Sequence, residues 1–207
     1  ADNDHEDDDI SVTAQQQRRF QEVLDQLPER GRGLCRHLAN SAGTLLNRHL
    51  HHDMVRVGLA LYGQAPAKHL DDVVPLQPAL AVRARVTLIR NIPAGVGVSY
   101  GHRFVSQRPT RLAVVAIGYA DGILRALSGK IHGLHGSQRL PQVGAITMDQ
   151  VLLDATEAPS LETGSTVTLL GRDGDAEISP QDWSELCGSI PWEILCGFKQ
   201  RLPRIEV

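Results

Sequence analysis

Lysine and aromatic side chains are scarce in this sequence. Its 207 residues include three lysines, three phenylalanines, three tyrosines and two tryptophans, and the formal net charge at pH 7 is −3. Proteins that bind nucleic acid usually carry a basic surface and aromatic side chains on which bases stack. The composition therefore argues against DNA or RNA as a partner and favours a small molecule.

Long apolar runs are also missing. No segment approaches the roughly 20 apolar residues of a membrane-spanning helix, and the acidic start over residues 1–9 is the reverse of a basic signal peptide. Neither a membrane location nor secretion is predicted. The start has no methionine and no helix-capping pattern, so we interpret it as an internal loop exposed by truncation.

Cysteine is rare as well. Cys35, Cys187 and Cys196 cannot all pair with one another, and their spacing is unlike that of a zinc site, so reduced thiols in the cytoplasm are the simplest interpretation. The run His49–His52 contains three histidines. Without a second Cys/His group at ligand spacing, it is interpreted as a solvated helix end, and no metal is predicted.

The 42% of apolar residues is enough for a core, and their pattern divides the chain in two. Over residues 1–74, helices and strands alternate with short connections, which is typical of a parallel α/β unit with strands buried on both faces. The expected elements are a helix over 13–27 with a Thr13–Gln16 capping box and a stop at Pro28, a strand over 35–39, a short helix capped by Asn40 or Ser41 and carrying Leu45, Leu46 and Leu50, and a strand over 54–57.

Residues 75–207 have a mostly β pattern. Apolar residues alternate with arginine and threonine over 80–88, which predicts a long, half-buried strand of the antiparallel type. Two late helices are expected to begin at Ser179-Pro180 and Ser189-Ile190-Pro191, where a capping serine comes just before a proline of the first turn. Shorter strands are expected around 112–117, 142–146, 150–154 and 166–170.

The most informative segment is Gly-Tyr-Ala-Asp-Gly at 118–122. It follows the apolar run 112–117, so it places the phenol of Tyr119 on a tight Asp-Gly turn at the end of a buried strand. A side chain held there is fixed yet open to a ligand, and tyrosine can act as a general acid or base. An ordinary hairpin turn with a packed tyrosine is the alternative, since Asp-Gly is common in such turns.

Four more segments lie in order around Tyr119: His37–Ala42, Met54–Gly63, Val98–Gly101 and Gly144–Gln150. Together they closely resemble alanine racemase, a pyridoxal-phosphate enzyme of fold type III. The resemblance extends over essentially the whole chain, but only over the second half of the family's protein. It implies that residues 1–74 supply the last helices and strands of a TIM (β/α)8 barrel and that residues 75–207 form a β-rich, barrel-like domain.

The resemblance implies a cofactor site in residues 1–74. The family's phosphate-contacting residues match Ser41, Gly58 and Leu59, although a helix cap and a strand-end glycine would also explain these positions. In the family the arginine matched by Arg56 donates to the pyridine nitrogen, and because a guanidinium stays protonated this contact favours racemisation over transamination. His37 resembles the histidine that orients this arginine, with a core histidine as the alternative.

The resemblance also implies the catalytic residues. Stereoinversion needs a base on each face of the substrate. In the family these bases are a tyrosine, matched by Tyr119, and the Schiff-base lysine, whose motif is absent from this sequence. By resemblance, Met148 binds the substrate carboxylate through its backbone N–H, beside Asp149. The 207-residue chain alone is predicted to be inactive, because its lysines match nothing catalytic: Lys68, Lys130 and Lys199.

Two further features follow from the resemblance. In family dimers the counterparts of Tyr119 and Met148 reach the active site of the other subunit, so a homodimer with shared sites is implied. Ser99-Tyr100-Gly101 resembles a motif near the entrance, and a core or interface tyrosine is an equally good interpretation. Alignment on Arg201–Arg204 places Gln200 where most members have a tyrosine that helps to hold the phosphate.

The sequence therefore predicts pyridoxal-phosphate-dependent interconversion of L- and D-alanine by two bases, which supplies D-alanine for peptidoglycan. A serine racemase or another barrel-type pyridoxal-phosphate enzyme is an alternative, although the Gly-Tyr-Ala-Asp-Gly and Met-Asp-Gln segments argue against a decarboxylase. A catalytically inactive dimerising domain is an alternative of a different class, and the absent lysine is its best support.

Overall fold

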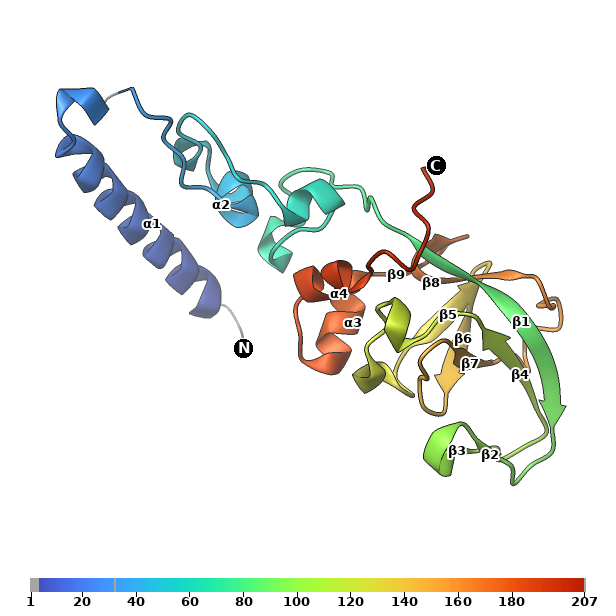
Figure 1. Ribbon diagram of the computed structural model, residues 1–207. Coiled ribbons are helices and arrows are strands. Elements are labelled where there is room, and N and C mark those ends of the chain that lie inside the picture. The colour runs from blue at the N-terminus through green and yellow to red at the C-terminus, as the bar shows by residue number, and fades with distance from the viewer. Residues whose placement is uncertain (1–3, 32, 207) are drawn as a thin grey trace. The chain divides into compact units, whose positions relative to one another are not determined.

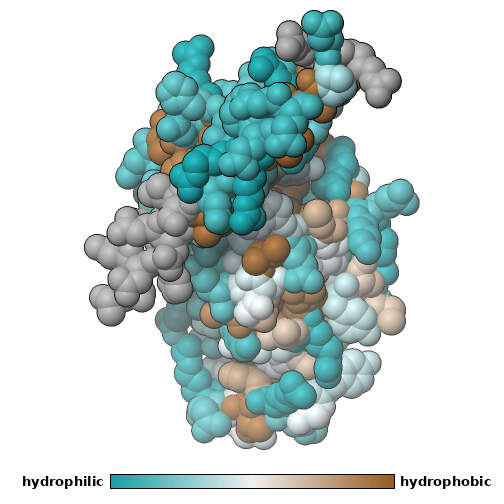
Figure 2. All heavy atoms as spheres, turned by 90° about the vertical axis from the view of Figure 1, so that its left-hand side faces the viewer, coloured by the Kyte–Doolittle hydropathy of each residue, from teal (hydrophilic) through white to brown (hydrophobic). Residues whose placement is uncertain are grey.

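The computed structural model of the protein describes residues 4–31 and 33–206. The chain divides into two units, which we call unit 1 (Ala1–Ala79) and unit 2 (Leu80–Val207). In Figure 1 unit 1 runs from blue to teal and unit 2 from green to red. The face shown in Figure 2 is mostly hydrophilic, with hydrophobic side chains in small separate patches. No helix of the described residues combines the length and the apolar character needed to cross a membrane.

Unit 1 consists of helices and short helical turns. Its α-helices are α1 (Asp4–Asp25) and α2 (Ser41–Leu46), and its 3-10 turns are η1 (Glu29–Gly31), η2 (Arg48–Leu50), η3 (Leu59–Tyr62) and η4 (Lys68–Leu70). Asn40 caps α2, because its side-chain oxygen accepts the Gly43 N–H at 3.0 Å. The helix predicted to start at Asn40 or Ser41 is thereby confirmed, although Leu50 falls in η2 rather than in the same helix.

The start of α1 corrects the sequence analysis. The helix begins at Asp4 and not at residue 13, so the part of the acidic start that the structure describes is helical rather than a loop. Thr13 lies inside the helix, and the Thr13–Gln16 capping box is therefore wrong. Because the helix continues N-terminal to Thr13, no N-cap falls at that residue.

The two strands predicted in unit 1 are reduced to a single parallel bridge between His37 and Met54. Both residues are exposed, and so is Arg56, so the expectation of strands buried on both faces is wrong for the described chain. The physical reason is that, within the described residues, no further strand pairs with this bridge to build a sheet that could bury it.

Unit 2 contains a seven-stranded antiparallel sheet in the order β1-β4-β7-β6-β5-β8-β9. An additional pairing joins β1 to β8, so the first six of these strands form a closed ring, with β9 at the outer edge of β8. The strands are β1 (Val82–Ile92), β4 (Thr110–Val115), β5 (His132–His135), β6 (Gln138–Val143), β7 (Val151–Asp154), β8 (Thr166–Asp173) and β9 (Ala176–Ile178), and a separate pair is β2 (Gly97–Val98) and β3 (Phe104–Val105).

Strand β1 makes the closure possible. Residues 82–85 pair with β8, whereas residues 86–92 pair with β4, and the register shifts between Val86 and Leu88. A bulge of this kind bends and twists a strand, so one long strand can take part in both sides of a barrel. The long antiparallel strand predicted from the alternation over 80–88 is confirmed.

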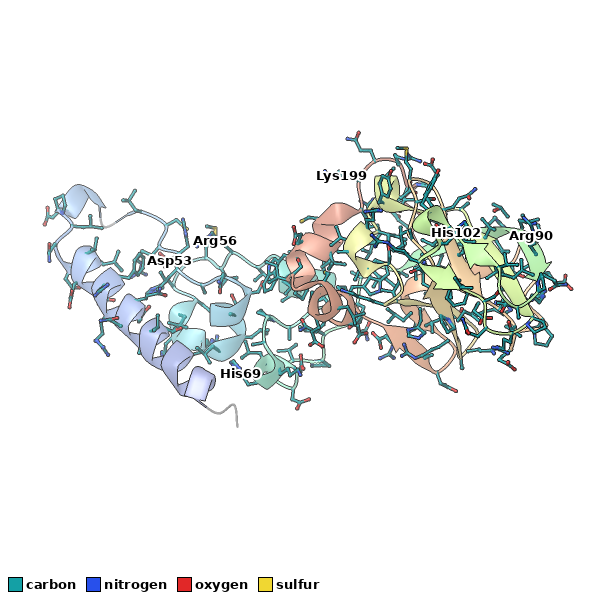
Figure 3. All side chains as sticks on the ribbon, turned by 90° about the horizontal axis from the view of Figure 1, so that it is seen from below. Asp53, Arg56, His69, Arg90, His102 and Lys199 are labelled. Atoms are coloured by element: carbon teal, nitrogen blue, oxygen red, sulfur yellow. The ribbon has the colours of Figure 1, made fainter. Side chains whose placement is uncertain are left out.

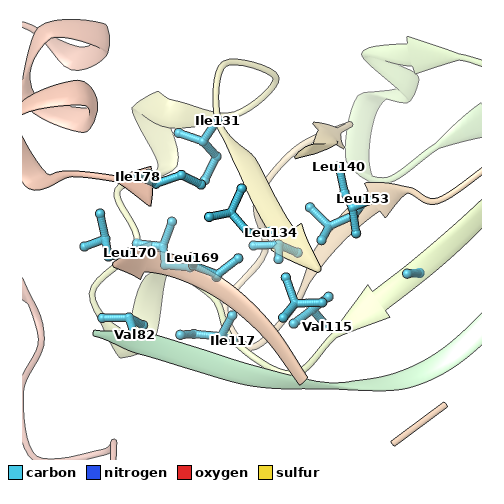
Figure 4. Packing of buried hydrophobic residues seen from close by; sticks show 14 of the residues in the cluster. Val82, Val115, Ile117, Ile131, Leu134, Leu140, Leu153, Leu169, Leu170 and Ile178 are labelled. Carbon is cyan, nitrogen blue, oxygen red and sulfur yellow. The ribbon is translucent and has the colours of Figure 1, made fainter. Parts of the chain in front are cut away.

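Buried aliphatic side chains from opposite strands fill the ring, as Figure 4 shows for Leu134, Leu153 and Leu169. Two helices follow, α3 (Pro180–Cys187) and α4 (Pro191–Gly197), each with proline in its first turn as predicted. Ser179 caps α3 in a capping box with Asp182. The Ser189 cap is wrong, because Ile190 occupies the N-cap of α4 and the Ser189 hydroxyl bonds instead to the Glu193 carboxylate.

Candidate active site

Tyr119 lies on a turn that leaves the barrel after β4. The turn is the 3-10 segment η6 (Tyr119–Asp121), and it is closed by Asp121, whose carboxylate accepts the Gly118 N–H at 2.8 Å. The alternative of an ordinary hairpin is wrong, because β4 pairs with β1 and β7 and not with β5, the next strand along the chain. Tyr119 is 43% exposed, so a ligand can reach this residue.

A second loop, at residues 147–150, is fastened to this turn by the backbone. The Tyr119 N–H donates to the Thr147 carbonyl at 2.9 Å, and the Ala120 N–H donates to the Met148 carbonyl at 3.0 Å. Gly118 allows this approach, since a Cβ there would come within 2.3 Å of the Thr147 oxygen. The structure thus brings Tyr119 together with Met148 and Asp149, the two residues predicted to line the substrate site.

The Met148 backbone is suited to the role that the resemblance implies for it. Its carbonyl is bonded to the turn, whereas no hydrogen bond within the described part of the chain uses its N–H. Met148 is 52% exposed, so the loop is accessible at this residue. An unpaired N–H at an accessible loop can donate to a carboxylate.

Arg201 connects the same two loops and was missed by the sequence analysis. Its Nε lies 3.0 Å from Asp121 Oδ1, and its Nη2 lies 2.6 Å from Asp149 Oδ1. The hydrogen bond to Asp149 and the negative charge of Asp121 raise the pKa of Arg201 above its ordinary value. An arginine so distant in sequence could have been noticed only as part of the C-terminal Arg-Leu-Pro-Arg segment.

The chain after α4 continues beside the Tyr119 turn. Gly122 approaches the carbonyl of Gly197 so closely that a Cβ would lie 2.6 Å from that oxygen. A pocket is lined by Ala120 and by residues 199–204, which include Gln200 and Arg201. Gln200 therefore lies in unit 2 next to the turn, and its contact with a phosphate stays a prediction.

In unit 1, Ser41 joins the start of α2 to the start of η3. Its buried hydroxyl oxygen accepts the Gly58 N–H at 3.0 Å and the Ala60 N–H at 3.3 Å. A hydroxyl that accepts two bonds still has its own proton to donate, which a phosphate oxygen could accept. Leu59 is buried as the first residue of η3, and a Cβ at Gly58 would meet no atom within 4 Å, so a ligand can approach the backbone there.

Arg56 and His37 form a pair across the parallel bridge. Arg56 Nη1 lies 2.7 Å from His37 Nδ1, and the Arg56 N–H donates to the Ala39 carbonyl at 2.8 Å. Because a guanidinium has only donors, His37 Nδ1 must accept, which leaves the proton of the neutral ring on Nε2. His37 is exposed, so the alternative of a core histidine is wrong.

A neighbouring ion pair fixes these two segments to each other. Arg36 donates to the Asp53 carboxylate through Nε and Nη2, both at 2.8 Å, and through its backbone N–H at 2.9 Å. Figure 3 shows Asp53 and Arg56 close together on this part of unit 1. Hydrogen bonds from Arg36 hold the pKa of Asp53 well below its ordinary value of 3.8.

The Arg36–Asp53 ion pair should make the stability of the folded chain depend on pH in the acid range. Because the folded pKa of Asp53 lies below the unfolded value of 3.8, its stabilising effect is complete above that value and is lost as the pH falls from 3.8 through the folded pKa. A carbon-13 NMR titration should show Asp53 ionised at pH 3.8. The Arg36→Gln variant should titrate near 3.8, and an unchanged titration would show that Arg36 is not the cause.

The histidine run at residues 49–52 was expected to be a solvated helix end rather than a metal site. Within the described residues, no group of three or more His, Cys, Asp or Glu side chains is arranged to hold a metal ion. His51 Nε2 lies 2.8 Å from the Thr44 carbonyl, and His52 Nε2 lies 3.1 Å from the Gln17 side chain. Both rings are part of the packing of unit 1.

The closed sheet and the exposed Tyr119 beside it form a β-rich domain with a candidate acid–base site. The family model described as "Alanine racemase, C-terminal domain" matches residues 79–206, and that described as "Alanine racemase, N-terminal domain" matches residues 1–66. The chain belongs to the alanine racemase family, and the resemblance found in the sequence is confirmed.

Individual relatives agree with this assignment. The chain is 61% identical over 197 residues to the alanine racemase of Prochlorococcus marinus, a match that covers 95% of this chain and 51% of that protein. The crystal structure of alanine racemase from Bartonella henselae with covalently bound pyridoxal phosphate has a TM-score of 0.84 at 36% identity, over 95% of this chain and 52% of that one. The structure from Bacillus anthracis with bound L-Ala-P has a TM-score of 0.83 at 36% identity, over 91% and 49%. The chain spans about half the length of the relatives it matches.

Proposed function

We propose that this chain supplies the phenolic base and the cofactor-phosphate side of a pyridoxal-phosphate-dependent racemase that interconverts L- and D-alanine. The observation that carries the proposal is the half-exposed Tyr119, held on a turn whose backbone is bonded to the Thr147–Met148 loop. A phenol fixed by the backbone and open to a ligand is placed to exchange a proton with a bound substrate.

In this proposal Tyr119 is one of two bases. Its Oη takes the α-proton from one face of alanine or returns it there, and a base on the opposite face performs the reverse transfer. The family's second base is a lysine outside the motifs of this chain. The Met148 N–H binds the substrate carboxylate, and Asp149 lines the substrate site beside it.

The cofactor would be held by unit 1. When bound, pyridoxal phosphate supplies an electron sink that makes the α-hydrogen of an amino acid acidic. Ser41 would donate its hydroxyl proton to the phosphate beside Gly58 and Leu59. Arg56, oriented by His37, would donate to the pyridine nitrogen, and because a guanidinium keeps its proton it cannot pass one to the ring.

The wider assignments belong to the same proposal. Residues 1–74 supply the last helices and strands of a (β/α)8 barrel and residues 75–207 form the second domain, which the two family matches support. The protein acts in the cytoplasm as a homodimer with shared active sites and provides D-alanine for peptidoglycan. The described cysteines are unpaired, which suits a reducing compartment: Cys35, Cys187 and Cys196.

A chimaera tests the proposed function. In it, this chain replaces the matching half of the Prochlorococcus marinus alanine racemase, and the unmodified relative is the positive control. We expect the chimaera to racemise L-alanine, and a coupled assay with D-amino-acid oxidase measures the D-alanine formed. L-Serine should be turned over more slowly than L-alanine. A folded chimaera without turnover of alanine would contradict the proposal, and a preference for serine would favour the serine racemase alternative.

Arg56 should control which reaction occurs. In the chimaera, Arg56→Glu is expected to slow racemisation and to raise the proportion of transamination. A carboxylate can accept a hydrogen bond from a protonated pyridine nitrogen, whereas a guanidinium can only donate one to that nitrogen. Pyruvate formation, coupled to lactate dehydrogenase, measures the side reaction against D-alanine formation. Arg48→Glu changes an exposed arginine of η2 and serves as the matched control. An unchanged product ratio would make Arg56 a structural residue only.

A further inference from the structure

The turn that carries Tyr119 and the loop that carries Met148 are joined by more than backbone bonds. Arg201 lies beyond α4, and its guanidinium contacts Asp121 of the turn at 3.0 Å and Asp149 of the loop at 2.6 Å. The two backbone bonds alone connect residues 119 and 120 to residues 147 and 148. The guanidinium thus adds a second connection between the two loops, made entirely by side chains.

The two contacts of Arg201 differ in importance because their surroundings differ. The Asp121 side chain is only 8% exposed, whereas that of Asp149 is 57% exposed and that of Arg201 is 53% exposed. A buried carboxylate is costly without a cationic partner, while an ion pair between exposed groups contributes little. Breaking the contact with Asp121 should therefore cost more than breaking the contact with Asp149, which holds another nitrogen of the same guanidinium at the second loop.

Asp121 also links this ion pair to the backbone of the turn. Its other oxygen, Oδ2, accepts the Gly118 N–H at 2.8 Å, one residue before Tyr119. The guanidinium neutralises the same carboxylate that closes the turn. Without Arg201, Asp121 would be a buried charge without its cation and would be drawn towards water, which would loosen the hold on Gly118.

We infer that Arg201 is a positioning residue that fixes the Tyr119 phenol relative to the Met148–Asp149 loop. The inference rests on the proposed function for its effect on the reaction, but not for its effect on the loops. The guanidinium of arginine suits this task, because its nitrogens lie in one plane and can donate to two carboxylates at once. Lysine would keep the positive charge, but its single ammonium group lacks this geometry.

Hydrogen exchange of the 207-residue chain tests the effect on the loops without any activity. The amides of Tyr119 and Ala120 donate to the second loop, so their exchange reports whether the two loops separate. Arg201→Gln is expected to speed their exchange by about tenfold or more, with a smaller effect in Arg201→Lys. Asp149→Asn removes the charge of the exposed contact only, and it keeps the test valid if Arg201→Gln does not fold.

The matched control is Arg172→Gln, which removes a surface ion pair with Glu177 at 2.6 Å in the β8–β9 hairpin. It should leave the Tyr119 and Ala120 amides unchanged. Equal exchange in the wild-type chain, Arg201→Gln and Asp149→Asn would overturn the inference.

Deuterium wash-out from alanine in the chimaera tests the effect on the reaction. Because Tyr119 acts on one face of the substrate, Arg201→Gln should slow exchange from L-alanine more than from D-alanine.

The double variant Tyr119→Phe/Arg201→Gln should exchange L-alanine no more slowly than Tyr119→Phe alone, since a positioning residue acts through the group it positions. Equal losses for both enantiomers, or additive losses in the double variant, would overturn the inference. A wild-type chimaera without turnover would instead contradict the proposed function, and amide exchange would still decide whether Arg201 holds the loops.

Discussion

Tyr119→Phe in the chimaera is expected to slow deuterium exchange at the α-carbon of L-alanine by about 10²–10⁴-fold, the usual cost of losing a positioned acid–base group. The substitution keeps the ring and removes only the ionisable oxygen. The turn is held by backbone bonds and by Asp121, neither of which involves the phenol, so the fold of unit 2 should survive. Unchanged thermal unfolding would verify this.

The asymmetry between enantiomers is the sharper part of this prediction. By the family resemblance Tyr119 abstracts the proton from L-alanine, and the opposing base abstracts it from D-alanine, so exchange from the D form should be better preserved. Proton NMR of each enantiomer in deuterated buffer follows the two rates separately. Tyr62→Phe removes a half-exposed phenol from unit 1 and should change neither rate. Equal loss for both enantiomers would mean that Tyr119 supports the site as a whole, and full retention would make it an ordinary turn residue.

The alternating strand β1 could be predicted, whereas the barrel it closes could not. Its residues alternate because one face packs on the core, and that period is visible in the sequence. Closure depends on a register shift near Val86 that no local pattern reveals. Strand β5 was missed because it is short and contains Gly133. That glycine is a packing requirement, since a Cβ there would lie 2.6 Å from Val167 Cγ1 and 2.8 Å from Leu153 Cδ1.

In the candidate site, too, some features follow from local sequence patterns and others depend on segments far apart in the chain. Tyr119 could be found from the sequence, because a glycine-flanked phenol after an apolar run is a local pattern. Its approach to Met148 required the ordered family motifs, and the ion pairs of Arg201 could not be predicted, since they join three segments far apart in the chain. The expectation that the strand over 54–57, which carries Arg56, is buried on both faces was wrong for a related reason. Burial of a strand depends on its neighbours in the sheet, and a single bridge provides none within the described residues.

The 207-residue chain by itself is expected to show no alanine racemisation, which is the largest effect that we predict. In the proposed function it carries the phenolic base and the phosphate-side residues, and the family's lysine base lies in a motif that this sequence does not contain. Inversion of configuration needs a base on each face, so one base can exchange a proton on its own face but cannot invert the carbon. Coupling to D-amino-acid oxidase measures the rate, and co-expression with the N-terminal half of the Prochlorococcus marinus enzyme should restore turnover if the two halves assemble.

Lys199 is the lysine whose substitution tests this prediction most directly, because it lies near the Tyr119 turn. It lines the pocket beside the Tyr119 turn together with Ala120, and Figure 3 labels it at the end of α4. If the chain alone racemises alanine and Lys199→Ala abolishes that activity, then Lys199 has taken the place of the missing base and the assignment of two bases to two halves is wrong. Lys130→Ala is the matched control, because Lys130 donates instead to the Leu186 carbonyl at 3.0 Å. We expect all three proteins to be equally inactive alone, because a base must lie opposite the phenol to complete inversion, and a lysine on the same side as Tyr119 would only duplicate it.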